Sequence, residues 1–179
     1  KKYNLSLRYA KEGNTDMAQI QLKKVVSQNP RLLKAQQLLA LIYIKEKEYS
    51  KARKCLASVL RVDRNNTLAQ LYMQAIDEEL SSYLYEYLDD SAAAEEVEMH
   101  TNNSVLLYTK YGDTYYALIS PGNFCPLVYY EFVFDGDFIN ISDYTVYEPY
   151  LFIEKQKEDE AVYLLSNGTV LKIKDNEII

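Results

Sequence analysis

The sequence predicts an α+β chain in which helical-hairpin repeats are followed by a small antiparallel β-meander domain. Three observations predict this class. Apolar and small residues recur at a 34-residue spacing in the first half, strand-like runs separated by turn residues fill the second half, and the two halves carry opposite net charge. A period of roughly 20 to 50 residues is typical of stacked supersecondary units, so the first half is expected to be an array of helix pairs.

The 34-residue spacing relates residues of the same kind along the first half. Small residues at repeated positions let two helices approach closely, and the larger apolar residues fill the space between them. The related pairs are Leu5 with Leu39, Tyr9 with Tyr43, Ala18 with Ala52, Leu22 with Leu56, and Val25 with Val59.

Helical periodicity and cap residues predict five helices in this half. Gly13 suits a helix C-cap, and Asn29-Pro30 ends the second helix. Thr15 or Asp16, Ser50 and Thr67 are the expected N-caps. The helices are expected over 3–12, 17–28, 32–44, 50–62 and from 67 to about 87.

Residues 1–83 resemble the tetratricopeptide repeat family. The resemblance departs from the family pattern at Lys2 and Gln36, where an aromatic residue is usual, at Lys47 in place of Gly, and at Arg64 in place of Pro. About two and a half repeats are expected, in an array that begins upstream of Lys1. The matching residues are Leu5-Ser6, Tyr9, Gly13, Ala18, Leu22, Val25 and Pro30 in one repeat, and Leu39-Ala40, Tyr43, Tyr49, Ala52, Leu56 and Val59 in the next.

The resemblance implies a concave groove lined by the first helix of each repeat. The side chains expected to line this groove are largely apolar, which suits an amphipathic helix or an extended peptide as the ligand. A clamp for a terminal carboxylate is not expected, because its first-repeat positions correspond to Tyr3 and Leu7. The alternative is that these side chains are core between helix layers or are covered by the downstream chain. The groove residues implied are Tyr3, Leu7, Lys11, Gln37, Leu41, Ile44, Lys45, Leu71 and Ala75.

The second half reads as short strands at the spacing of an antiparallel barrel, sandwich or propeller-like fragment. The hairpin at Asn167-Gly168 is expected to contain a type I′ turn. The domains are expected at 1–88 for the helical repeats, 89–103 for an acidic linker with a short helix, and 104–179 for the Tyr-rich β domain. The strands are expected over 105–109, 114–119, 127–134, 138–141, 145–154, 161–165 and 169–173.

The net charge of −6 conceals a split between the halves. Residues 1–64 carry 15 Lys/Arg and 5 Asp/Glu, whereas residues 65–179 carry 5 and 21. Solvent-facing lysines on helices explain the basic half more simply than a nucleic-acid surface does, since aromatic and Arg residues do not interleave there. An acidic partner, or the acidic half folding back on the basic half, would also account for the split. No nucleic-acid partner is expected.

Catalytic and metal-binding motifs are missing from the sequence, so no enzyme, metal or cofactor is expected. The run Asp135-Gly136-Asp137 with Asn140 lacks full calcium-loop spacing and is expected to be a hairpin turn. Cys55 is expected to be a small core residue, and a disulfide to Cys125 is not expected. The adjacent pairs Tyr115-Tyr116 and Tyr129-Tyr130 are expected to place rings on both sheet faces.

A non-catalytic adaptor that binds a protein or peptide segment is therefore the first functional expectation. A carbohydrate- or surface-binding module that uses the β-domain tyrosines is the alternative, and an enzyme with a site between the halves is the third. A homo-oligomer is a further expectation, because a second copy of the chain would cover the helix left exposed at the end of a short array. No apolar run is long enough to span a membrane. The cytoplasm is favoured, and Tyr-, Asn- and Lys-rich usage indicates a bacterial source.

Overall fold

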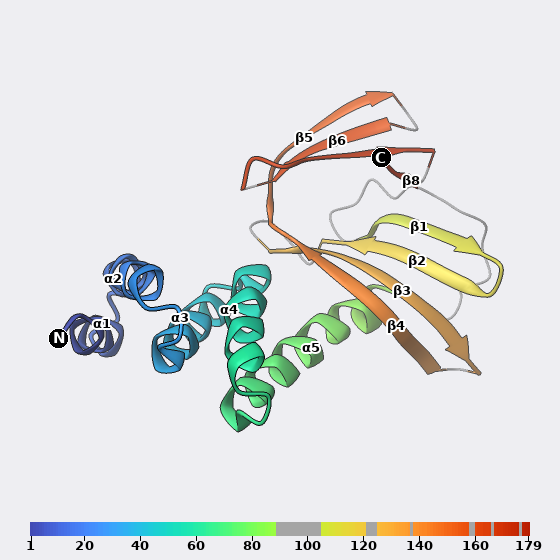
Figure 1. The fold of residues 1–179 in the computed structure, drawn as a ribbon. Coiled ribbons are helices and arrows are strands. Elements are labelled where there is room, and N and C mark those ends of the chain that lie inside the picture. The colour runs from blue at the N-terminus through green and yellow to red at the C-terminus, as the bar shows by residue number, and fades with distance from the viewer. Residues whose placement is uncertain (89–104, 121–124, 137, 158–159, 166, 176) are drawn as a thin grey trace. The chain divides into compact units, whose positions relative to one another are not determined.

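The computed structural model describes residues 1–88, 105–120, 125–136, 138–157, 160–165, 167–175 and 177–179. Within these residues, five helices precede eight strands, which confirms the α+β class (Figure 1). The chain divides into two compact units, Lys1–Asp77 and Glu78–Ile179, here called the helical unit and the sheet unit. The division lies within the fifth helix. The expected linker over 89–103 lies outside the described residues.

The helices form hairpins in chain order. Helices α1 (Lys2–Lys11) and α2 (Thr15–Gln28) make the first pair, and α3 (Leu33–Lys45) and α4 (Tyr49–Val62) make the second. Helix α5 (Thr67–Tyr87) takes the position of the first helix of a third unit. This order is the one that the 34-residue period predicts.

Burial follows the same period as the sequence. Ala18 and Ala52 are both fully buried, and so are Leu22 and Leu56. The period continues into α5, because Ala69 is fully buried and lies one period after the fully buried Ala35. Small side chains at these positions allow the helix axes to come close, which is why the repeat retains alanine there.

Helix ends differ from the expected caps by one or two residues. The Asn14 side chain accepts a hydrogen bond from the Met17 backbone N–H at 3.2 Å, and Asn66 accepts one from Ala69 at 3.0 Å. Thr15, Asp16 and Thr67 therefore lie inside the helices, and the prediction of them as caps was wrong. Helix α4 begins at Tyr49, so Ser50 is also inside its helix. Asparagine fits the N-cap because its short side chain reaches back to the first free N–H groups.

The strands form two antiparallel meanders, each in chain order. Both sheets are separate and neither closes into a barrel. Sheet 1 contains β1 (Val105–Tyr111), β2 (Thr114–Ile119), β3 (Leu127–Asp135) and β4 (Phe138–Tyr147), and sheet 2 contains β5 (Tyr150–Lys157), β6 (Glu160–Leu165), β7 (Val170–Lys174) and β8 (Glu177–Ile178).

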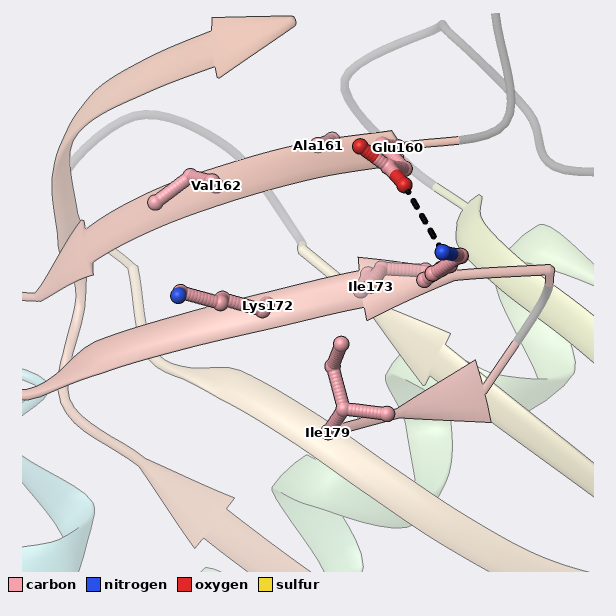
Figure 2. Close-up of a pocket in the computed structure, with 7 residues that line it drawn as sticks. Glu160, Ala161, Val162, Lys172, Ile173 and Ile179 are labelled. Carbon is pink, nitrogen blue, oxygen red and sulfur yellow. Dashed lines mark ion pairs between the residues drawn. The ribbon is translucent and has the colours of Figure 1, made fainter. Parts of the chain in front are cut away.

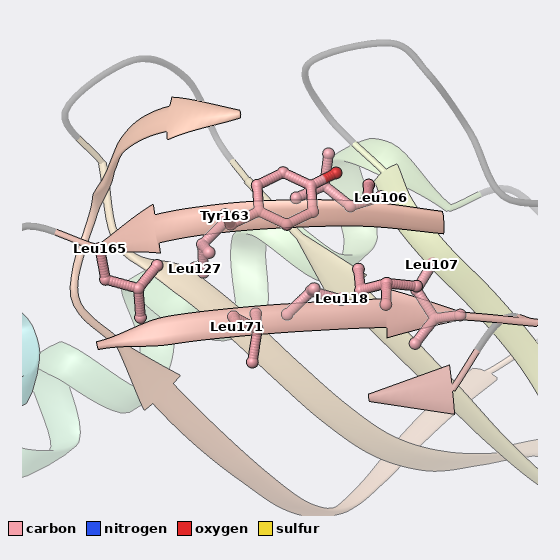
Figure 3. Close-up of a cluster of buried hydrophobic side chains, with 9 residues drawn as sticks. Leu106, Leu107, Leu118, Leu127, Tyr163, Leu165 and Leu171 are labelled. Carbon is pink, nitrogen blue, oxygen red and sulfur yellow. The ribbon is translucent and has the colours of Figure 1, made fainter. Parts of the chain in front are cut away.

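One apolar cluster joins the two sheets, as in a sandwich (Figure 3). Leu107, Leu118 and Leu127 come from sheet 1, and Tyr163 and Leu171 come from sheet 2. Both sheets therefore bury one face in the same core, which agrees with the sandwich among the three expected arrangements.

The opposite face of sheet 1 is covered by the second half of α5. The Tyr130 hydroxyl donates to the Leu80 carbonyl, and the Tyr85 hydroxyl donates to the Ile139 carbonyl at 2.6 Å. Tyr130 and Leu84 are both fully buried. Sheet 1 thus lies between a helix and a second sheet, and its central strands bury Tyr130 on the face toward the helix and Leu118 on the face toward the second sheet.

The strand expected over 145–154 was wrong. Strand β4 continues to Tyr147, and the chain leaves it at Glu148-Pro149, because proline has no N–H to give to a ladder. The turn expected at Asp143 is a bulge at Ser142, where the pairing shifts between Glu131 and Phe132.

Glycine supplies a positive φ in the turns at Gly112, Gly136 and Gly168, and Asp175 adopts a φ of 50° between β7 and β8. Gly168 has a φ of 84°, but its N–H donates to the Leu165 carbonyl, and the Leu165 N–H donates to Thr169. Asn167 does not have a positive φ, whereas a type I′ turn needs one at both central residues, so the expected type I′ turn was wrong. At the third hairpin Asp135 pairs with Phe138 around Gly136, which is the ordinary turn expected there. Asp137 lies outside the described residues.

Candidate functional site

A groove with a volume of about 370 Å³ lies on the helical unit. Its lining comes from α1, α3 and α5, which are the first helices of successive repeat units. Two aromatic and three leucine side chains make most of the lining, together with one lysine and one glutamine. The lining residues are Tyr3, Lys34, Gln37, Leu38, Leu41, Leu68 and Tyr72.

The repeat period places these side chains in rows. Gln37 lies one period after Tyr3, and Tyr72 lies one period after Leu38. Equivalent positions on stacked helices project to the same side of an array, so the period itself gathers them in one groove. Leu41 is 43% exposed and Leu68 is 40% exposed, which leaves apolar surface open to solvent around the groove.

Three of the nine expected groove residues line this groove: Tyr3, Gln37 and Leu41. None of the nine is buried, so the alternative that they form core between helix layers does not describe them. Beyond the three lining residues, Leu7 and Ile44 are half-buried, and Lys11, Lys45, Leu71 and Ala75 are exposed.

Sequence reasoning missed four lining residues. Leu38 and Tyr72 are related by the 34-residue period, which could have identified them together. Lys34 lies one turn before Leu38 on α3, and Leu68 lies one turn before Tyr72 on α5, which puts each pair on one helix face. The groove is therefore displaced toward the N-terminal ends of α3 and α5 relative to the expected residues.

Hydrogen bonds hold the helices that flank the groove. Gln37 Nε2 donates to Asn66 Oδ1 at 2.7 Å, and Asn66 caps α5, so a groove residue is tied to the start of the next helix. Arg53 and Asp77 form an ion pair at 2.7 Å between α4 and α5. Gln19, one period before Arg53, donates to Glu46, the residue that follows α3.

The helical unit is strongly basic. Residues 1–77 carry 15 Lys/Arg and 6 Asp/Glu, and Lys34 brings an exposed ammonium group to the groove. Exposed charges of one sign raise the local concentration of ligands of the opposite sign and speed their association. The groove therefore combines leucine surface with one lysine, on a unit that carries an excess of positive charge.

A second hollow of about 220 Å³ lies over β6 and β7 of the sheet unit (Figure 2). Val162, Lys172 and Ile179 border it, and Glu160 pairs with Lys174 at 3.1 Å. One ion pair supplies no nucleophile with an adjacent base, which acyl or glycosyl transfer would require.

The described residues contain no group of three His, Cys, Asp or Glu side chains that could hold a metal ion. Cys55 and Cys125 are free thiols, both half-buried, and burial raises the pKa of Cys55 to about 11. A thiol with a raised pKa is a poor nucleophile at neutral pH. Across the part of the chain that is described, none of the helices is both long and apolar enough to cross a bilayer.

Comparison with curated proteins and with solved structures gives no match. Residues 9–76 match a family model described as tetratricopeptide repeat, and this segment runs from α1 into α5. No family model matches the sheet unit. Proteins of this family generally mediate protein–protein interaction and are typically non-catalytic. The matched segment contains α2, α3 and α4 with parts of α1 and α5, so residues 9–76 of the helical unit are similar to tetratricopeptide repeats.

Proposed function

We propose that the chain is a non-catalytic adaptor whose helical unit binds a protein segment in the groove between α1, α3 and α5. The observation that carries this proposal is the pair of leucines that line the groove and stay exposed, since Leu41 and Leu68 are 43% and 40% exposed. Exposed apolar surface of this kind marks an interaction site in a soluble protein. The family assignment of residues 9–76 supports the same role.

The chemistry of the lining favours an amphipathic helix or an extended peptide with apolar anchors. Apolar side chains of the partner would contact Leu38 and Leu41, while Gln37 and Lys34 would bond to its polar groups. Each fully buried leucine-sized anchor contributes roughly 1.5–3 kcal/mol from burial, so two or three anchors contribute about 3–9 kcal/mol before the ordering cost of association is subtracted.

The test is selection of peptides that bind the full chain from a displayed library of random 16-residue sequences. Selected peptides are then titrated calorimetrically against the chain and against Leu41→Glu with Leu68→Glu. Placing two carboxylates on the apolar surface is expected to weaken binding at least tenfold. Both leucines are exposed, so the double variant is expected to keep its thermal unfolding midpoint.

Ile20→Glu with Val62→Glu is the matched control. These residues are 47% and 56% exposed, but neither lines the groove. Peptides that bind the leucine double variant and the parent chain equally would refute the groove as the binding site. A selection that yields no peptide above background would refute peptide binding by this chain.

A further inference from the structure

Four tyrosines cross sheet 1 diagonally, one from each strand, on the face opposite α5. We call this set the tyrosine ladder: Tyr111, Tyr116, Tyr129 and Tyr147. The rings of Tyr111 and Tyr116 lie 5.9 Å apart edge to face, and those of Tyr116 and Tyr129 lie 6.0 Å apart and nearly parallel. Tyr129 and Tyr147 pack against the core cluster, whereas Tyr111 is 54% exposed.

Carboxylates flank Tyr111 and Tyr116, which we call the open end of the ladder. Glu131 lies directly across from Tyr116 on one side and from Asp143 on the other. The Tyr111 hydroxyl donates to Glu177 of β8. Among the described side chains, neither Glu131 nor Asp143 pairs with a lysine or an arginine.

Like charges directly opposite each other destabilise an antiparallel sheet. The hydroxyl of Ser142, the bulge residue, lies 3.1 Å from the Glu131 carbonyl oxygen and 3.2 Å from its carboxylate, so the two acceptors share one proton, and the Asp143 carboxylate accepts from the Tyr144 N–H. A cation at this position would remove the repulsion between Glu131 and Asp143, so the arrangement is complementary to positive charge.

The charge of the sheet unit favours the same kind of ligand. Residues 78–179 carry 5 Lys/Arg and 20 Asp/Glu, so this unit repels anions and attracts cations. Tyrosine rings on this sheet already accept an ammonium group, because Lys110 Nζ lies 5.0 Å from the centre of the Tyr115 ring on the opposite face.

We propose that the open end of the tyrosine ladder is a second binding site, distinct from the groove, and that it takes a Lys- or Arg-rich segment of a partner protein. Cationic side chains lie over the Tyr111 and Tyr116 rings and pair with Glu131, Asp143 and Glu177. The site is independent of the proposed groove function, since it uses only residues of the sheet unit.

The test titrates the full chain with three probes: a decapeptide of alternating Lys and Gly, the same peptide with Glu for Lys, and cellohexaose. Only the Lys peptide is expected to bind through the ladder, and its affinity is expected to fall as salt rises. Tyr111→Leu with Glu131→Gln is expected to weaken this binding about tenfold, from one lost cation–π contact and one lost charge pair.

Phe138→Leu with Asp135→Asn is the matched control, because it removes an exposed aromatic residue and an exposed acid outside the ladder. It is expected to change the affinity less than twofold, and unchanged unfolding midpoints establish that both double variants fold. Equal losses in the two double variants would overturn the site in favour of diffuse attraction to acidic surface. Failure of the Lys peptide to bind would also overturn it, and so would ladder-dependent binding of cellohexaose in its place.

Discussion

Helix α5 is buried in two different ways along its length. In its first half, Ala69 and Ile76 are buried at positions that repeat those of Ala35 and Ile42 in α3. In its second half, Leu80 and Leu84 belong to the sheet unit, where Tyr130 bonds to the Leu80 carbonyl. The first half of α5 therefore packs as a helix of a repeat does, and its second half packs as a helix that covers a sheet.

The two units use different residue types at their buried contacts. The helical unit uses alanine where helices meet, because close approach leaves no room for a larger side chain. Sheet 1 uses aromatic rings instead: Tyr115 and Phe132 stack at 5.6 Å on the face toward α5. Large flat side chains suit the layer between a helix and a sheet, because each ring buries a large apolar area there.

The strongest test of the contrast is overpacking in the helical unit. Ala52→Leu adds three carbon atoms at a position with no exposed surface, and it is expected to destabilise the fold by about 1–3 kcal/mol, because neighbouring helices must separate. Urea unfolding followed by helical circular dichroism measures the loss. Ala57→Leu, at an exposed position on the same helix, is the control and is expected to have little effect. Equal effects at both positions would contradict the close approach of the helices.

Sequence reasoning predicted the helical unit well because one physical cause, close packing of stacked hairpins, fixes both the period and the burial. It predicted sheet 1 and sheet 2 less well, because turn residues such as Ser142-Asp143 also occur at bulges. Whether such a pair ends a strand depends on the neighbouring strand, which no local pattern encodes. The groove was predicted in part: Leu41 follows from the repeat, but the position of the hollow depends on how α3 and α5 pack.

A smaller effect distinguishes two buried hydroxyls on the aromatic face of sheet 1. Tyr130→Phe is expected to cost about 1 kcal/mol, because the Leu80 carbonyl loses a buried donor. Tyr108 is also buried, but its hydroxyl has no hydrogen-bond partner among the described residues, so Tyr108→Phe is expected to be neutral or stabilising by up to about 1 kcal/mol. Thermal unfolding of the two variants side by side measures the difference, and a larger loss from Tyr108→Phe would contradict it.

The same pair predicts a dependence on alkaline pH. Burial raises the pKa of both hydroxyls above the ordinary value of a tyrosine. The unfolded chain therefore releases these protons first, so the stability that they contribute is complete below about pH 10 and is lost as the pH rises further. Tyr130→Phe and Tyr108→Phe are each expected to reduce the loss of stability between pH 9 and 11. Unchanged pH profiles would contradict the burial of these hydroxyls.

The smallest expected effect concerns the turn after the first helix of each repeat. Gly13 ends α1 with a φ of 77°, and Lys47, one repeat period later, adopts a φ of 59° after α3. A lysine in the left-handed region costs about 1 kcal/mol or more, whereas glycine adopts it freely, although glycine loses more backbone entropy on folding. Lys47→Gly is therefore expected to stabilise the helical unit by about 0.5 kcal/mol, measured as a higher unfolding midpoint. Lys47→Ala, which removes the same charge but keeps the Cβ, is the control, and an equal gain from it would assign the effect to charge. If glycine stabilises the chain and alanine does not, the turn at Lys47 has the same backbone conformation as the turn at Gly13, although glycine suits that conformation better than lysine does.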